Sequence, residues 1–70
     1  FEAYRAAASV HTMRRQWDEA IALWDQFLAQ RPQNGRAHYE RARTRQAKGD
    51  GKGFLRELQQ ACAFGHQAAC

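Results

Sequence analysis

The apolar helical pattern of this chain returns after 34 residues, and this period constrains the fold more than any other feature. Residues 34 positions apart have the same or similar side chains in five pairs: Ala3 with Ala37, Ala8 with Ala42, Ile21 with Leu55, Trp24 with Leu58 and Gln26 with Gln60. A fixed period of this length is typical of arrays in which one supersecondary unit recurs. Because stacked units expose extended surfaces, the period favours a binding scaffold and leaves the ligand open.

Apolar spacing predicts four amphipathic helices, each with one face that packs against its neighbours. They cover about residues 2–13, 17–30, 36–47 and 52–63, and residues 66–70 have the pattern of the start of a fifth helix. Pro32 and the Asn34-Gly35 pair end the second helix, and the Gly49 segment separates the third from the fourth. Val10 and Ile21 are the only β-branched aliphatic residues, so we expect an all-α, antiparallel helix-hairpin array.

Helical spacing also predicts which side chains lie inside. Four aromatic residues are assigned to the core: Trp17, Trp24, Phe27 and Phe54. The inner face of the third helix is expected to carry Ala37, His38, Arg41, Ala42 and Arg45, and His11 is assigned to inner-face packing in the first helix. A basic row of Arg41, Arg45, Lys48 and Lys52 is interpreted as a solvated face.

The first half of the chain resembles the tetratricopeptide repeat, a helix–turn–helix unit of 34 residues. The resemblance rests on aromatic, small and proline positions at the spacing of that repeat: Tyr4, Ala8, Trp17, Ala20, Trp24, Phe27 and Pro32. In physical terms, the small residues let two helices approach closely and the large ones fill the space beside them. The resemblance implies a superhelical array whose general role is protein–protein interaction.

The second half departs from this pattern, with Phe54 at a small-residue position and Gly51 at an aromatic one. Its end, residues 60–70, resembles a Sel1-like repeat, whose cysteine-rich members place two cysteines eight residues apart around a glycine turn. We therefore expect a tetratricopeptide-like repeat over residues 1–34 and a second, Sel1-like one over residues 35–70 that includes the start of a following helix. The chain opens within a helix, so we also expect it to be part of a longer protein with further domains.

Cys62 and Cys70 are the only cysteines, and three states are open to them. The Gly65 turn can bring them within the Cα separation of a disulfide, which would imply a periplasmic or secreted protein. Two reduced, buried cysteines are the second possibility and would permit a cytoplasmic location. Metal binding through Cys62, His66 and Cys70 is the third, although Gly65 interrupts the helix and no fourth ligand is evident.

In the family that the chain resembles, the first helix of each repeat lines the concave groove. By position, this resemblance assigns partner binding to Arg5 and Ser9, with Glu2 and Thr12 on the same face, and to Arg36, Tyr39 and Arg43 in the second repeat. Guanidinium groups beside a phenol suit the recognition of carboxylate or phosphate groups. A solvated helix face is the alternative interpretation.

The rest of the sequence gives no sign of catalysis, of a cofactor or metal site, or of a membrane span. No nucleophile–base pair is visible, because Ser9 is the only serine and His11 points away from it on a helix. No cofactor motif, resident metal site or membrane-spanning segment is expected. The formal net charge of +4 suits an acidic protein or peptide partner, whereas sparse aromatic interleaving and the lack of a nucleic-acid motif disfavour RNA or DNA.

Three functional hypotheses follow from the sequence. The leading one is a non-catalytic interaction module that binds a partner peptide or helix in its concave groove, within a larger envelope or secreted bacterial protein. The second is a structural spacer or cap of a larger scaffold, without a ligand of its own. The third is weak nucleic-acid binding through basic helix faces.

Overall fold

The computed structural model describes residues 1–70 as an all-helical chain. Its elements are α1 (Glu2–Met13), α2 (Trp17–Gln30), α3 (Gly35–Lys48), α4 (Gly51–Ala63) and the short 3₁₀ helix η1 (Gln67–Ala69). The predicted all-α fold is confirmed, and each of the four predicted helices begins and ends within one residue of its observed bounds. None of these helices combines the length and the apolar character that a bilayer crossing requires.

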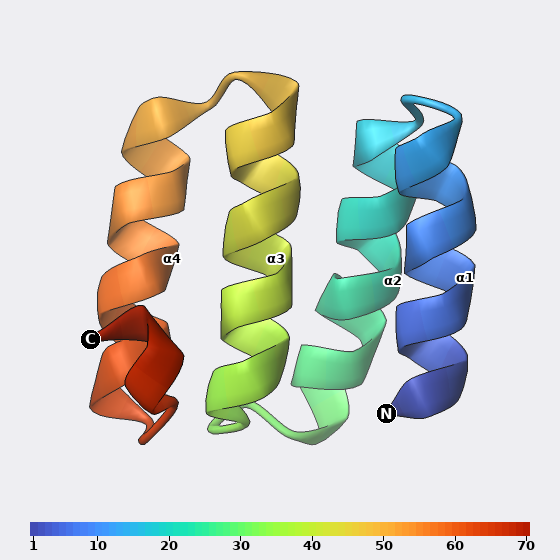
Figure 1. The fold of residues 1–70 in the computed structure, drawn as a ribbon. Helices are drawn as coiled ribbons and strands as arrows, with labels where there is room; N and C mark the ends of the chain where they lie inside the picture. Colours follow the sequence, from blue (N-terminus) through green and yellow to red (C-terminus); the bar gives the residue numbers. More distant parts are fainter.

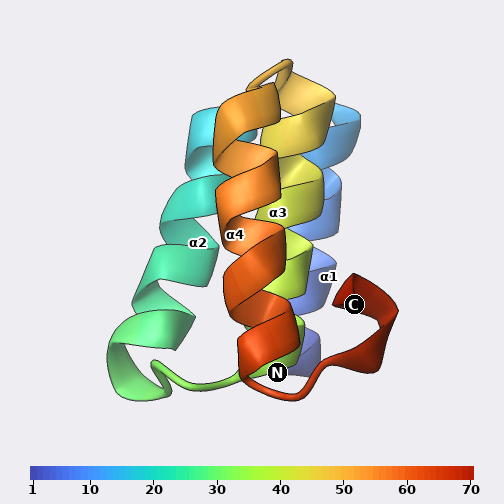
Figure 2. The same ribbon diagram turned by 90° about the vertical axis from the view of Figure 1, so that its left-hand side faces the viewer.

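The four helices stand side by side as an antiparallel array in chain order (Figure 1). Each helix packs against the next, α1 on α2, α2 on α3 and α3 on α4, and η1 packs on α4. Turned by 90°, the array shows α2 at one side and α1 and α3 towards the other (Figure 2). Two helix hairpins are thus joined edge to edge, as short connections between antiparallel neighbours dictate.

The core lies mainly between α1, α2 and the start of α3, and Trp24 is its largest fully buried side chain. The rings of Phe1 and Phe27 contact Trp24 and each other, and Tyr4 contacts Phe27; the centroids of these four pairs are 5.3–6.2 Å apart, mostly in edge-to-face contact. Such offset and edge-to-face arrangements add to the stabilisation that apolar burial provides. The predicted core positions Trp24 and Phe27 are therefore confirmed.

Small residues stand where the helices approach one another most closely. Five alanines are buried to 3% exposure or less: Ala8, Ala20, Ala37, Ala42 and Ala61. At Gly35, an added Cβ would lie only 3.0 Å from the carbonyl oxygens of Ala61 and Phe64. The beginning of α3 thus packs directly against the end of α4, an approach that a side chain at this position would prevent.

Local signals explain where the second hairpin starts and turns. The Asn34 side chain caps α3 by accepting a hydrogen bond from the Ala37 amide, and Asp50 caps α4 by accepting one from the Gly53 amide. Gly49 ends α3 with φ of 99°, a left-handed conformation that suits glycine. These caps satisfy backbone groups that would otherwise lack partners at the helix ends.

Three sequence predictions require correction. Residues 66–70 do not start a fifth α-helix, because Gln67–Ala69 form a single 3₁₀ turn that folds back onto α4. Phe54 and Trp17 were predicted to lie in the core, but both are only partly buried. Trp17 is the first residue of α2 and lies beside the turn that follows α1, where fewer neighbours cover it than in the middle of the helix. Phe54 belongs to α4, which packs mainly on α3 and the short η1, whereas α2 lies between two full helices.

We predict that Trp24→Ala will destabilise the chain by about 3–5 kcal/mol, because the remaining core cannot close over the lost indole volume. Urea denaturation followed by circular dichroism measures this change. Leu55→Ala is the matched control: Leu55 is 59% exposed although it corresponds to Ile21 by the repeat period, so its truncation should change stability by less than about 0.5 kcal/mol. Similar losses in the two variants would contradict this description of the core.

Candidate functional site

A buried carboxylate, Glu57, is the centre of an ion cluster that joins α4 to α3. Its side chain is 5% exposed, and Arg41 contacts it through two hydrogen bonds, Nε to Oε1 at 2.5 Å and Nη2 to Oε2 at 2.9 Å. The same guanidinium donates through Nη1 to Asp25 Oδ1 on α2, also at 2.5 Å. Arg41 therefore links three helices through one planar group, with the two-pronged geometry that makes such pairs strong.

His38 completes the cluster from the preceding turn of α3. Its Nδ1 lies 2.7 Å from Glu57 Oε2, and its Nε2 lies 2.8 Å from the carbonyl oxygen of Pro32. A ring that carries both protons donates to both oxygens, whereas the neutral ring satisfies only one of them. The prediction that His38 lies on the inner face is confirmed. Besides packing there, its ring links α4 to the α2–α3 turn through its contacts with Glu57 and the Pro32 carbonyl oxygen.

The environment of the cluster keeps both Glu57 and Arg41 charged. Burial raises the pKa of Glu57, but the hydrogen bonds from Arg41 and His38 and their charges outweigh it, so the pKa lies below its ordinary value. Burial lowers the pKa of Arg41, yet the bonds to Glu57 and Asp25 and their charges raise it above its ordinary value. The cluster is thus a fixed ionic contact between the helices at neutral pH.

The basic row of the sequence is not a uniformly solvated face, and this interpretation is corrected. Arg41 is 18% exposed, and Arg45 is 30% exposed with contacts to Glu57 at 3.4 Å and Asp50 at 3.6 Å. Lys48 bonds Asp18 on α2 at 2.8 Å. Only Lys52 forms no ion pair. Arg41 and Arg45 point inward because they pair with carboxylates between the helices. Without these partners, burying their charges would be costly.

A groove of about 330 Å³ runs between α1 and α3. Its floor includes Ala8 and the buried indole of Trp24, and its walls carry polar and charged side chains of both helices. The α1 wall consists of Arg5, Ser9, Thr12 and Met13, and the α3 wall of Glu40, Arg43, Thr44 and Ala47. Arg43 forms no ion pair, whereas Arg5 is bound to Glu2 at 3.0 Å. The groove therefore offers exposed apolar side chains at Met13 and Ala47 and at least one uncompensated cation, Arg43.

The structure brings three of the five predicted partner-binding residues into this groove: Arg5, Ser9 and Arg43. Arg36 lies outside the lining, with its guanidinium 4.4 Å from the centroid of the Phe1 ring and 3.9 Å from Glu2. Tyr39 also lies outside it and contacts the His66 ring at 4.7 Å. Glu40 and Thr44 line the groove but were not predicted, although Glu40 lies one turn before Arg43 and Thr44 directly follows it.

The C-terminal segment is held to the array by covalent and aromatic contacts. Cys62 and Cys70 are joined as a disulfide, with their Cα atoms 5.0 Å apart. His66 contacts Tyr39, and the exposed Phe64 ring lies 5.2 Å from His38. The structure contains no group of three or more His, Cys, Asp and Glu side chains that could hold a metal ion. These contacts close the end of α4 over the start of α3.

Comparison with known proteins agrees with the hairpin array. Residues 1–44 match the sequence model of the tetratricopeptide repeat. The chain belongs to the tetratricopeptide repeat family. No curated protein and no solved structure matches it at a significant level. The Sel1-like resemblance of residues 60–70 therefore stays a prediction, while the family assignment gives a general role in protein interaction and a typically non-catalytic scaffold.

Sequence reasoning missed Glu57, although a signal for it was present. Arg41 and Arg45 were both predicted to face inward, and inward guanidinium groups require a nearby carboxylate. Glu57 lies between Gly53 and Ala61 at intervals of four residues, which places it on the inner face of α4 among small side chains. The inward position of the arginines and the inner-face position of Glu57 together predict an ion pair between Arg41 and Glu57.

We predict that Glu57 makes the fold sensitive to acid. The folded-state pKa lies below the ordinary value of 4.5, so the unfolded chain takes up this proton at a higher pH than the folded chain. The stability that ionised Glu57 provides is complete above the unfolded pKa and declines as the pH falls through the folded one. Urea denaturation over the range of about pH 2–6 measures this loss.

Glu57→Gln is the variant that isolates this contribution. It keeps the shape of the side chain but removes its charge, so it should cost about 3 kcal/mol at neutral pH and flatten the acid dependence. Glu19→Gln is the control, since Glu19 is exposed and forms no ion pair. An acid profile that is the same in the Glu57→Gln variant and the wild type would exclude this carboxylate as its source.

We predict that the cysteine pair stabilises the C-terminal segment through a disulfide. Alkylation and intact-mass measurement should show no modified cysteine before reduction and two after it. The double variant Cys62→Ser/Cys70→Ser should lose about 2–3 kcal/mol, because the unfolded chain regains the freedom of the closed loop. Alkylation of both cysteines in native, unreduced protein would contradict the pairing.

Proposed function

We propose that this chain is a non-catalytic interaction module that binds an acidic peptide or helix of a partner protein in the α1–α3 groove. The observation that carries the proposal is the groove itself, whose walls bear Arg5 and Arg43 together with the exposed apolar side chains of Met13 and Ala47. The family to which the chain belongs supports a role in protein interaction.

The shape of the groove favours a peptide over a small molecule. It is open and follows two parallel helix faces, so an extended segment or a helix can lie along it and place side chains on both walls. Ser9, Thr12 and Thr44 supply hydroxyl groups along its length. The accessible apolar surface of the lining comes from the exposed side chains of Met13 and Ala47, so a ligand with both acidic and apolar side chains fits this groove.

Charge sets the expected ligand chemistry. Arg43 is exposed and has no carboxylate partner, so a partner carboxylate can pair with it without breaking an existing contact. Arg36 and Tyr39 share a face of α3 with Arg43, and we propose that they extend the binding surface towards the N-terminal end of α1. Glu40 adds a negative wall position that would disfavour a ligand carboxylate beside it.

The wider context forms part of the same proposal. We propose two repeat units, residues 1–34 and 35–70, within a larger protein of the bacterial envelope or a secreted protein. The disulfide supports an oxidising compartment, since such bonds persist outside the cytoplasm. A spacer or cap without its own ligand is the alternative, and the exposed apolar side chains of Leu55 and Phe64 on the second hairpin favour it.

We predict that selection of a displayed random peptide library against the whole chain will enrich acidic peptides. Arg43→Glu should weaken the binding of a selected peptide by roughly tenfold or more, because it removes a charge-assisted hydrogen bond and adds repulsion. Fluorescence anisotropy measures the Kd, and circular dichroism checks that the helical content is unchanged.

Arg31→Glu is the matched control, because Arg31 is exposed and lies outside the groove at the end of α2. It makes the same change in net charge and should alter the Kd by less than about twofold. If the Arg43 and Arg31 variants bind as the wild type does, the groove assignment is wrong. If no peptide is enriched, the spacer function is supported instead.

A further inference from the structure

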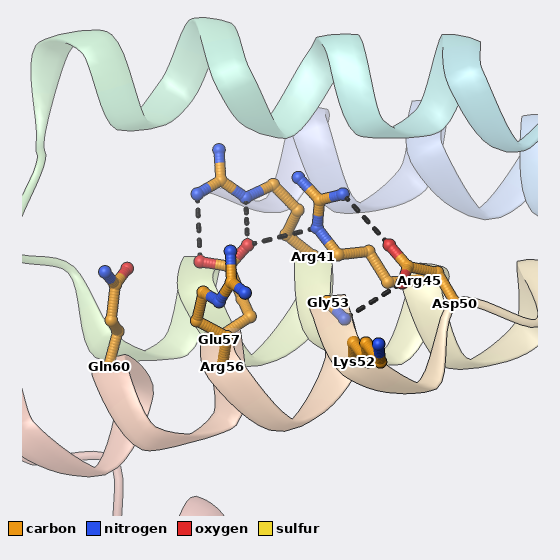
Figure 3. A pocket seen from close by; sticks show the side chains of 8 residues that line it. All are labelled: Arg41, Arg45, Asp50, Lys52, Gly53, Arg56, Glu57 and Gln60. Atoms are coloured by element: carbon orange, nitrogen blue, oxygen red, sulfur yellow. Dashed lines mark hydrogen bonds and ion pairs between the residues drawn. The ribbon is translucent and has the colours of Figure 1, made fainter.

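The chain has a second concave surface, which faces away from the groove. This cleft of about 360 Å³ has no apolar side chain in its lining. Figure 3 shows α4 along one edge and α2 running past the other, with Arg41 and Arg45 of α3 reaching upward between them. Lys52, Arg56 and Gln60 of α4 line the rim, with Lys52 seen end-on in Figure 3, and Asp50 and Glu57 complete the lining with Gly53.

The two concave surfaces lie on opposite sides of α3. Arg43 lines the groove, whereas Arg41 and Arg45, two residues before and after it, line the cleft. A helix turns by about 100° per residue, so a separation of two residues directs side chains to nearly opposite faces. A ligand in the cleft therefore does not compete for space with a ligand in the groove.

Positive charge exceeds negative charge in the cleft. Four cationic side chains line it, Arg41, Arg45, Lys52 and Arg56, against two carboxylates, Asp50 and Glu57. Arg41 is fully engaged by Glu57 and Asp25, but Lys52 and Arg56 form no ion pair at all. They stand one helical turn apart on α4, which places them on the same face.

Arg45 brings a third donor to the unpaired cations. Its ion-pair distances are long, 3.4 Å to Glu57 and 3.6 Å to Asp50, and its side chain remains 30% exposed. Such contacts leave hydrogen-bonding capacity in the guanidinium fork. Gln60 adds an amide donor further along the rim.

We propose that this cleft, which side chains of α3 and α4 line, binds a phosphate monoester dianion through Arg45, Lys52 and Arg56. A phosphate monoester carries a charge of about −1.5 to −2 at neutral pH and three strong acceptor oxygens. This charge matches the excess of two cations in the lining, and the three acceptors match three donors at the rim. Arginine suits this ligand because its planar fork binds phosphate oxygens in pairs.

The surroundings limit the ligand to a single, compact anion. The neighbouring helix α2, which runs past the cleft without lining it, carries Asp18 and Asp25, which already pair with Lys48 and Arg41. A continuous polyanion such as RNA or DNA would run past these carboxylates beyond the rim. A phosphorylated protein side chain or a free phosphate monoester meets only the local excess of positive charge.

Titration of the ¹⁵N-labelled full chain with two probes tests this inference. One probe is inorganic phosphate, and the other is a short phosphoserine peptide with uncharged flanking residues. Saturable shifts confined to amides of residues 45–60 are expected. The combined change Lys52→Gln/Arg56→Gln should weaken binding roughly tenfold or more, through loss of two charge-assisted contacts on exposed side chains.

Arg14→Gln is the control, because Arg14 is exposed, forms no ion pair and lies at the turn between α1 and α2, away from the cleft. It should change the dissociation constant by less than about twofold. Tighter binding of the peptide identifies a phosphorylated protein as the source, and equal binding identifies the free anion.

Three results would overturn the inference. The first is the absence of saturable shifts with either probe. The second is equal weakening by Arg14→Gln and by the cleft variant, which would reduce the effect to net charge. The third is tighter binding of a short single-stranded oligonucleotide than of either phosphate probe, with steep dependence on salt, which would assign this face to nucleic acid.

Discussion

The burial of one carboxylate, Glu57, is the constraint on which the second half of this structure depends. A charge at 5% exposure is tolerated only when cations and hydrogen bonds surround it, and the chain meets this demand with Arg41 and His38 from α3. Arg41 then extends the contact to Asp25 on α2. The first hairpin is held by the aromatic cluster around Trp24, whereas α4 buries little apolar surface and relies on this ionic junction.

The same junction divides the basic residues into two groups. Arg41 is fully paired with carboxylates between the helices, and Arg45 is partly paired with them. These two side chains therefore hold the helices together. Arg43 on the opposite face of α3, and Lys52 and Arg56 at the rim of the cleft, keep no acidic partner. A net positive charge that looks diffuse in the sequence is thus organised into a groove that suits an acidic peptide and a cleft that suits a compact anion. Helix geometry at α3 is what separates the two.

Much of the fold could be predicted because it rests on local chemistry. Proline and glycine mark the helix ends, and the spacing of Trp24, Phe27 and the alanines fixes the buried stripe of the first hairpin. The groove residues Arg5, Ser9 and Arg43 followed from the positions that the resemblance to the tetratricopeptide repeat assigns to the groove. Phe54 was misplaced because the repeat period assumes a helix on each side of α4, and η1 occupies the place that a fifth helix was expected to take.

The ion cluster was harder to foresee because its members are 16 and 19 residues apart and meet only when α3 and α4 pack. Periodicity assigns a residue to a face of its helix, but it does not say which side chain of the next helix lies opposite. The linings of the cleft and the groove also depend on which side chains of neighbouring helices lie opposite one another. Their charged residues could be seen in the sequence, whereas the division into paired and unpaired cations required the positions of the carboxylates.

A double-mutant cycle between Arg41 and Glu57 tests the central claim most directly. The free energy of unfolding would be measured at neutral pH for the wild type, Arg41→Gln, Glu57→Gln and the double variant. A buried, two-pronged pair predicts that each single change destabilises the chain and that the two losses are far from additive, with a coupling energy of about 2 kcal/mol. Additive losses, each within about 0.5 kcal/mol of the wild type, would show that the buried charge does not organise this structure.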